Sequence, residues 1–170
     1  MSILTFIFGN SKIVACATIF KENTMRSLLR HINIIARCAG MYRADKLGSS
    51  DLGAVYHSYI LTIFNNPGIS QDELAQNIYI NKSNVTRKVN FLEENGYVTR
   101  RQSKTDRRVI HVYPTDKMAQ LYPKVRAITD ECNEYLTDGL SEQQIEQLRM
   151  LLEYVSGRAK KYVNSRGTDA

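Results

Sequence analysis

The side chains with the clearest chemical use lie between Lys82 and Arg108. This stretch contains eight basic and three acidic residues, so it carries a net charge of +5 within a chain whose total is +6. Such a concentration of positive charge is typical of a surface that neutralises phosphates. The residues expected to contact DNA are Lys82, Ser83, Asn84, Thr86, Arg87, Lys88, Lys104, Arg107 and Arg108.

These residues divide by what they can contact on a duplex. Arg87, together with Ser83, Asn84 and Thr86, can hydrogen-bond base edges in the major groove. Either Arg107 or Arg108 is expected to enter a minor groove, where A·T-rich stretches concentrate negative potential. The alternative is a solvated charged loop without a DNA contact. Phosphates are the expected partners of Lys82, Lys88 and Lys104.

Two helices are predicted to position the first of these residues. Ser70 and Glu73 form a capping box, which predicts a short helix from Gln71. Asn81 can cap a second helix that runs to about Glu94. Its apolar residues fall at spacings of four and three, so they form one buried stripe and leave a polar, basic face outside. The stripe consists of Val85, Val89 and Leu92.

A charged hairpin is predicted to follow. Gly96 suits the left-handed residue that ends many helices. Residues 97–100 and 109–113 have the composition of strands, and the loop between them is too charged to be buried. A helix-turn-helix followed by such a hairpin is a winged helix.

The end of the second helix and the hairpin resemble the MarR family of bacterial transcription regulators. The family pattern is Leu-Glu-x-x-Gly followed by Asp-x-Arg-x-x-x-Val-x-Leu-Thr, with Pro114 here in place of the second leucine. The resemblance implies that Asp106 pairs with Arg100 or Arg101 and fixes the wing. The matching residues are Leu92, Glu93, Gly96, Asp106, Arg108, Val112 and Thr115.

The resemblance also implies an architecture for the whole chain. The expected fold class is mainly α with a small β-wing, in which a winged helix-turn-helix lobe is joined to N- and C-terminal dimerisation helices. The C-terminal segment supports dimerisation independently, because its apolar residues form a stripe wide enough to be buried on more than one side. The expected segments are a dimerisation helix at 24–48, the DNA-binding domain at 49–115, dimerisation helices at 116–163 and a disordered tail at 164–170.

Residues 1–23 are expected to form an extension outside this architecture. Ile3–Phe8 and Ile13–Phe20 are apolar and flank Gly9-Asn10-Ser11, which favours a short β-hairpin. The alternative is that residues 1–23 are not part of the native protein and that translation begins at Met25. A signal peptide is disfavoured, because no basic residue precedes the apolar run and no small-residue cleavage site follows it.

Two control mechanisms are open. Tyr56, His57 and Tyr59 could line the ligand cleft that the family resemblance implies, although aromatic residues at helical spacing are more often plain core. Cys38, which follows Arg37, could instead sense oxidants as a thiolate. Its alternative is a small buried residue in a dimer helix.

No metal, cofactor or enzymatic activity is expected. The histidines share no metal-ligand spacing with the cysteines, and no phosphate-cradling glycine loop is present. Three scattered cysteines favour a reducing cytoplasm over a disulfide framework. No run of apolar residues is long enough to cross a membrane. The histidines are His31, His57 and His111, and the cysteines are Cys16, Cys38 and Cys132.

The sequence therefore predicts a homodimeric regulator that binds a pseudo-palindromic operator in double-stranded DNA. The expected activity is repression, released by a small aromatic or anionic effector. One alternative is an oxidant-sensing regulator of the same fold. Another, from a different class, is a winged-helix module that binds proteins and not DNA.

Overall fold

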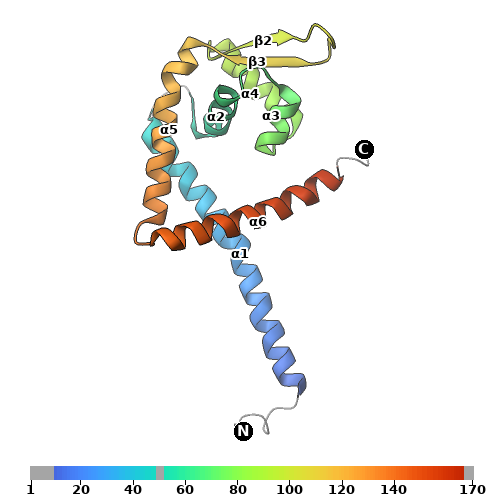
Figure 1. Cartoon of the computed structure of the whole chain (residues 1–170), viewed down its shortest axis with the longest axis vertical. Helices are drawn as coiled ribbons and strands as arrows, with labels where there is room; N and C mark the ends of the chain where they lie inside the picture. The colour runs from blue at the N-terminus through green and yellow to red at the C-terminus, as the bar shows by residue number, and fades with distance from the viewer. Residues whose placement is uncertain (1–9, 49–51, 167–170) are drawn as a thin grey trace. The chain divides into compact units, whose positions relative to one another are not determined.

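The computed structural model describes residues 10–48 and 52–166, which form two compact units with a boundary after Ile128. The first unit contains helices α1 to α4, a three-stranded sheet and most of α5 (Figure 1). The second unit contains the end of α5 and the whole of α6. The expected class, mainly helical with a small sheet, is confirmed. Within the described residues, no helix is both long and apolar enough to span a bilayer.

The first helix is longer than the sequence predicts. Helix α1 spans Asn10–Leu47, so residues 13–20 are helical and the predicted strand there is wrong. The dimerisation helix expected at 24–48 is part of this longer helix, so its predicted start is also wrong. Short apolar runs fit either structure, and a continuous helix satisfies its own backbone groups, whereas an isolated hairpin is only marginally stable. The other predicted strand, residues 3–8, lies outside the described residues.

A short 3-10 turn and a helix lead into the helix-turn-helix lobe. The turn η2 spans Ala54–Tyr56 and α2 spans His57–Asn65. A turn over residues 66–68 follows, and Gly68 adopts a left-handed φ of +87°. A Cβ atom at Gly68 would lie 3.0 Å from the Tyr113 ring, so only glycine fits here without strain.

The two predicted helices of the helix-turn-helix are confirmed. Helix α3 spans Gln71–Ile78, and both hydrogen bonds of the Ser70–Glu73 capping box are present. Helix α4 spans Lys82–Glu94, and the Asn81 side chain caps it. Gly96 adopts the predicted left-handed conformation, with a φ of +74°.

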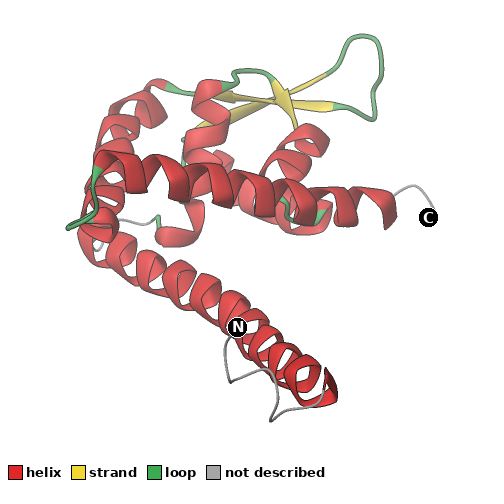
Figure 2. Cartoon of the chain, turned by 60° about the horizontal axis from the view of Figure 1, so that its bottom comes forward, coloured by secondary structure: helices red, strands yellow, loops and turns green. Residues whose placement is uncertain are grey.

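The sheet has one strand more than the predicted hairpin. Strands β2 (Val98–Gln102) and β3 (Ile110–Pro114) form the wing and pair antiparallel, with Val98 opposite Pro114. Strand β1 (Ile69–Ser70) pairs with the other edge of β3, so the order is β1-β3-β2. The loop between β2 and β3 projects beyond the helices of the lobe (Figure 2).

The core of the lobe is formed by α2, α3, α4 and the sheet, and α5 contributes to it. Several of its side chains are at most 1% exposed, among them Tyr59, Ile63, Leu74, Val112 and Met118. Because the core fixes one face of α4, the opposite face is held toward solvent.

Helices α5 (Asp116–Thr137) and α6 (Glu142–Arg166) complete the chain. Ser141 and Gln144 form a capping box at the start of α6, with both of its hydrogen bonds present. Helix α6 continues to Arg166, so the first three residues of the tail predicted to be disordered at 164–170 are helical. Residues 167–170 lie outside the described part of the chain.

Candidate nucleic-acid interface

Buried residues on one side of α4 determine which residues its outer side presents. The predicted stripe of Val85, Val89 and Leu92 is confirmed, and all three side chains are 0% exposed. Ser83 and Arg87, on the other side, are exposed, and Asn84 is half-buried. The outer face of α4 is therefore a fixed polar surface, as a major-groove helix requires.

The polar residues on this face contact one another. The Ser83 hydroxyl donates to Asn81 Oδ1 at 3.1 Å, and the Arg87 guanidinium donates to Asn84 Oδ1. Arg87 is thereby held along the helix face. A guanidinium or an amide can each form two hydrogen bonds to the edge of one base, so the pair can recognise bases in the major groove.

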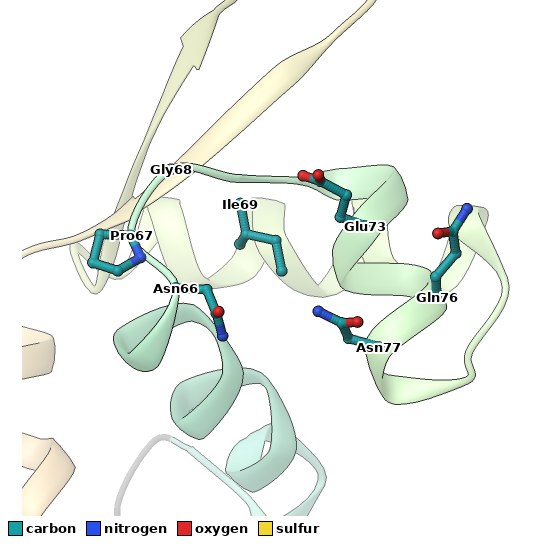
Figure 3. Close-up of a pocket in the computed structure, with 7 residues that line it drawn as sticks. All are labelled: Asn66, Pro67, Gly68, Ile69, Glu73, Gln76 and Asn77. Atoms are coloured by element: carbon teal, nitrogen blue, oxygen red, sulfur yellow. The ribbon is translucent and has the colours of Figure 1, made fainter. Parts of the chain in front are cut away.

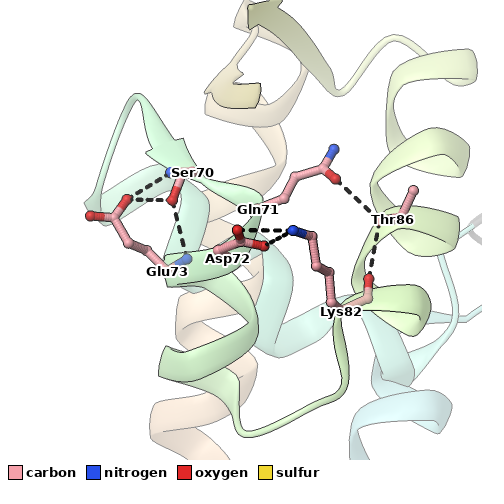
Figure 4. Close-up of polar contacts among 6 residues, drawn as sticks. All are labelled: Ser70, Gln71, Asp72, Glu73, Lys82 and Thr86. Carbon is pink, nitrogen blue, oxygen red and sulfur yellow. Dashed lines mark hydrogen bonds and ion pairs between the residues drawn. The ribbon is translucent and has the colours of Figure 1, made fainter. Parts of the chain in front are cut away.

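Lys82 and Thr86 point toward α3 (Figure 4). Lys82 Nζ lies 2.7 Å from Asp72 Oδ1, and both side chains are more than half exposed. Exposed ion pairs of this kind are weak, so Lys82 can exchange Asp72 for a phosphate at little cost. The Thr86 hydroxyl lies 3.0 Å from the Lys82 carbonyl oxygen and 3.2 Å from Gln71 Oε1, and it shares its proton between them.

Lys88 is attached to the aromatic residues beside α4. Its ammonium lies 4.7 Å from the centroid of the Tyr56 ring, which stacks on Phe91 with centroids 4.9 Å apart. Such a cation–π contact is worth about 0.5–1 kcal/mol at exposed sites. Lys88 is half-buried, and its ammonium lies against the Tyr56 ring at the end of η2.

The family resemblance implies that Asp106 pairs with Arg100 or Arg101, but Arg100 has another partner. Its backbone N–H and its Nε donate to the two carboxylate oxygens of Glu93, at 3.0 and 2.7 Å. Its Nη1 also donates to Asn90 Oδ1 at 2.5 Å. The side-chain hydrogen bond from Arg100 lowers the pKa of Glu93 below its ordinary value. We term these three residues, Asn90, Glu93 and Arg100, the wing clamp, because they fasten β2 to the end of α4.

Asp106 organises the wing loop itself. Its carboxylate accepts the N–H of Arg108 at 2.9 Å, and its own carbonyl accepts the N–H of Val109 at 3.0 Å. The alternative partner, Arg101, lies over the Tyr113 ring at 4.7 Å. Gln102 closes the loop by donating to the Arg107 carbonyl at 2.7 Å. The exposed cations of the loop are Lys104, Arg107 and Arg108.

The residues assigned to an effector cleft are mostly packed. Tyr59 is 1% exposed and Tyr56 is 7% exposed, and both belong to the core of the lobe. His57 is half-buried, and burial, followed by the nearby Arg43 charge, lowers its pKa. Cys38 is exposed on α1, whereas Cys132 is buried.

Other features of the described residues are weaker candidates. A polar groove of about 460 Å³ is lined by the turn before β1 and by the outer side of α3 (Figure 3). Its residues include Asn66, Gln76 and Asn77. Within residues 10–48 and 52–166, no three metal-ligating side chains come together as a metal site would require.

Comparison with known proteins agrees with this geometry. The model of the MarR family matches residues 55–110, which run from η2 to the start of β3. YybA, an HTH-type transcriptional regulator of Bacillus subtilis, is 27% identical over 77% of this chain and 87% of its own. BilQ, an HTH-type transcriptional regulator of Clostridium symbiosum, is 28% identical over 65% of this chain and 74% of its own. The crystal structure of a MarR family regulator from Listeria monocytogenes, complexed with 26mer DNA, superposes with a TM-score of 0.75. It is 27% identical over 79% of this chain and 89% of that chain.

Proposed function

Because this chain belongs to the MarR family of DNA-binding transcriptional regulators, we propose that it acts as a homodimeric repressor on a pseudo-palindromic operator. The observation that carries the proposal is the outer face of α4. It holds Arg87 beside Asn84, with the core fixing its orientation and the wing clamp setting the position of the hairpin. The Listeria regulator whose structure contains DNA supports the same use of this fold.

In this proposal α4 lies in a major groove and the wing loop reaches the adjacent minor groove. Arg87, with Ser83, Asn84 and Thr86, reads base edges. Lys82, Lys88 and Lys104 neutralise phosphates, and Arg107 or Arg108 enters the minor groove. Two copies related by a two-fold axis would bind half-sites about one helical turn apart.

Dimerisation is supported by apolar side chains on α6. Ile145, Leu148, Leu151, Leu152 and Val155 fall on one face at helical spacing, and each is between 37% and 64% exposed. Contiguous apolar surface of this kind is rarely left in water. A second copy of the same helix is the economical cover for it.

An effector would act by favouring one spacing of the two α4 helices over another, since a ligand with equal affinity for both states shifts nothing. The proposed effector is a small aromatic or anionic molecule bound near Tyr56, His57 and Tyr59. Because Tyr56 and Tyr59 are core residues, the half-buried His57 is the residue that such a ligand would meet first. Exposed Cys38 supports a second candidate, release by oxidation.

The test is a DNA titration with the full-length protein. Duplexes are first enriched from a random-sequence pool, and their shared sequence is then examined for two-fold symmetry. A symmetric site bound by two chains, with affinity that falls steeply as salt rises, supports the proposal. Salt-insensitive binding, or enrichment of no sequence, would favour the protein-binding module. If peroxide releases the wild-type protein from DNA and Cys38→Ser abolishes this release, the oxidant sensor is favoured.

A further inference from the structure

The turn that joins α4 to the wing contains an asparagine followed by a glycine. Asn95 and Gly96 are the only such pair in the chain. Asparagine is a thermally labile residue, and a following glycine makes it most labile, because no side chain hinders attack by the glycine nitrogen. Asn95 is half-buried, whereas Gly96 is exposed and no other part of the described chain crowds it. Water therefore has access to this pair.

The reaction open to such a pair is deamidation. The Gly96 nitrogen gives its proton to water or hydroxide and forms a bond to Asn95 Cγ. The Cγ–Nδ2 bond breaks, and ammonia leaves as a cyclic imide forms. Water then opens the imide on either side, which yields aspartate or isoaspartate. Overall, water is consumed and ammonia is released, so the conversion needs no enzyme, oxidant or cofactor.

The folded turn holds both reacting groups out of position. The Gly96 N–H donates to the Glu93 carbonyl oxygen at 2.9 Å, and Asn95 Nδ2 donates to the Phe91 carbonyl oxygen at 2.8 Å. Ring closure requires the Gly96 nitrogen to be nearly eclipsed with the Asn95 Cβ about the Cα–C bond. The Asn95 ψ of 7° keeps these two atoms apart. Asn95 must therefore leave its position at the end of α4 before it can react.

Two sets of contacts keep this turn closed. The wing clamp joins Glu93, which precedes the pair, to Arg100 of β2, which follows it. Lys117 and Thr115 donate to the carbonyl oxygens of Asn95 and of the glycine after it, at 2.8 and 2.7 Å. Helix ends open locally at a lower free energy than the core, so weaker contacts here raise the population of the open turn.

We infer that Asn95 is a modification site whose reactivity the wing clamp controls. While the clamp is closed, the side-chain amide is retained. When the turn opens, the pair converts to aspartate and isoaspartate. The extent of conversion is thus a covalent record of how often the junction between α4 and β2 has opened. This chemistry does not depend on the proposed DNA-binding function.

The products do not suit the closed turn. Conversion of Asn95 removes the donor to the Phe91 carbonyl oxygen and places a negative charge at the carbonyl end of α4, where the helix dipole disfavours it. Isoaspartate also lengthens the backbone by one carbon between α4 and β2. Because the clamp requires a fixed distance between these elements, the modified turn should close poorly and leave the wing loosely attached.

The experiment incubates the full-length protein in mildly alkaline buffer and follows each asparagine by peptide mass mapping. Asn95 should convert before every other asparagine. Glu93→Gln weakens the clamp without changing the reacting pair, so it should convert Asn95 about fivefold faster than wild type, as the loss of one ordinary hydrogen bond predicts. Glu94→Gln, at the exposed neighbouring position, is the matched control and should react at the wild-type rate. Arg100→Gln weakens the same clamp from β2 and replaces Glu93→Gln if that variant folds poorly.

The same incubation in concentrated urea isolates the chemistry from the fold. Without a folded turn, wild type and all variants should convert Asn95 at one common rate that exceeds every native rate. Circular dichroism confirms that each variant is folded in the native buffer.

Four results would overturn the inference. Native wild type could react as fast as in urea, or Glu93→Gln and Arg100→Gln could both match wild type in native buffer. Another asparagine could convert first, or Asn95 could remain intact in every native sample. None of these measurements involves DNA, so each of these results leaves the proposed function standing. Conversely, a wild-type protein that binds no duplex would overturn the proposed function and leave this inference standing.

Discussion

On α4, neighbouring polar side chains hold one another before any DNA arrives. Arg87 is bonded to Asn84, Ser83 to Asn81, and Thr86 to the carbonyl of Lys82. These contacts restrict rotamers that would otherwise be frozen on binding, at about 0.5–1.5 kcal/mol for each flexible side chain. The face that we propose reads bases is therefore partly preorganised.

Substitution of Arg87 and Arg108 should separate base reading from backbone binding. Arg87→Ala should cost about 1–3 kcal/mol on the selected duplex and relax the base preference. Arg108→Ala should weaken binding equally on all sequences. It should also reduce the slope of log affinity against log salt concentration by about one. Fluorescence anisotropy on selected and scrambled duplexes over a salt series measures both effects. Lys124→Ala, an exposed substitution on α5, serves as control, and equal, sequence-independent losses in both variants would contradict the assigned roles.

The wing clamp should make stability depend on pH. The pKa of Glu93 is lowered in the folded protein, chiefly by the Arg100 hydrogen bond, so its contribution is present above the unfolded pKa and is lost as pH falls through the folded pKa. Glu93→Gln should lower the free energy of unfolding by about 1 kcal/mol at neutral pH and flatten the loss below the ordinary glutamate range. Urea titrations at several pH values measure this. The exposed neighbour Glu94 gives the control Glu94→Gln, and an identical pH profile in both variants would refute a stabilising clamp.

At the scale of elements, residues close in sequence could be predicted and partners distant in sequence could not. The caps of α3, α4 and α6 follow from side chains within three residues of each helix start. Strand β1 is two residues long and exists only because β3 lies beside it, so its own sequence carries no strand signal. The extent of α1 is a similar case, because a short apolar run alone does not distinguish helix from strand.

The candidate site shows the same division. The exposed face of α4 follows from its buried stripe, which periodicity predicts. The partner of Arg100 cannot be predicted from the sequence, because three acidic residues lie close enough along the chain to pair with it. The turn at Gly96 brings Glu93 to Arg100, whereas the loop directs Asp106 to its own backbone. The Leu-Glu-x-x-Gly end of α4 contains the signal, since its glutamate is the one in the clamp. The sequence predicts Gln71 only as a helix start, because its burial depends on the packing of α3 against the rest of the lobe.

The turn before β1 should tolerate alanine less well than the turn after α4. Gly68 and Gly96 both have positive φ, but only Gly68 would bring a Cβ within 3.0 Å of another side chain, the ring of Tyr113. Gly96→Ala should cost about 1–2 kcal/mol for the left-handed backbone alone. Gly68→Ala should cost more, because the ring must also move. Thermal unfolding of both variants measures the difference, and equal losses would show that the contact with Tyr113 carries no weight.

At the scale of the whole molecule, the proposed dimer rests on the apolar face of α6. A leucine that is 64% exposed, such as Leu151, contributes little to a lone chain but becomes buried if a second copy covers it. Leu151→Glu should therefore shift the protein from dimer to monomer and weaken binding to a symmetric duplex. Sedimentation velocity measures the mass. Gln147→Glu on the same helix adds the same charge and should leave the dimer intact. A Leu151→Glu protein that remains dimeric would reject this face as the interface.

Removal of Met1–Asn23 tests whether the first part of α1 contributes to DNA binding. The family match begins at residue 55, and among the residues whose burial is described the core cluster of the lobe begins at Leu47, with Tyr42 packed against it. The truncated protein should bind the selected duplex within tenfold of wild type, which corresponds to about 1.4 kcal/mol. A larger loss in the anisotropy titration would assign this segment a structural or DNA-contacting role.

The wing clamp also separates the position of the hairpin from the choice of target sequence, two properties on which selection can act. Asn90, Glu93 and Arg100 fix how the hairpin stands against α4, and none of them is among the residues proposed to read bases. A gene copy can therefore change Ser83, Asn84 or Arg87 and acquire a new target sequence while it keeps the docking geometry it inherited. The clamp makes target choice evolvable one residue at a time, because no such step has to rebuild the scaffold that presents it.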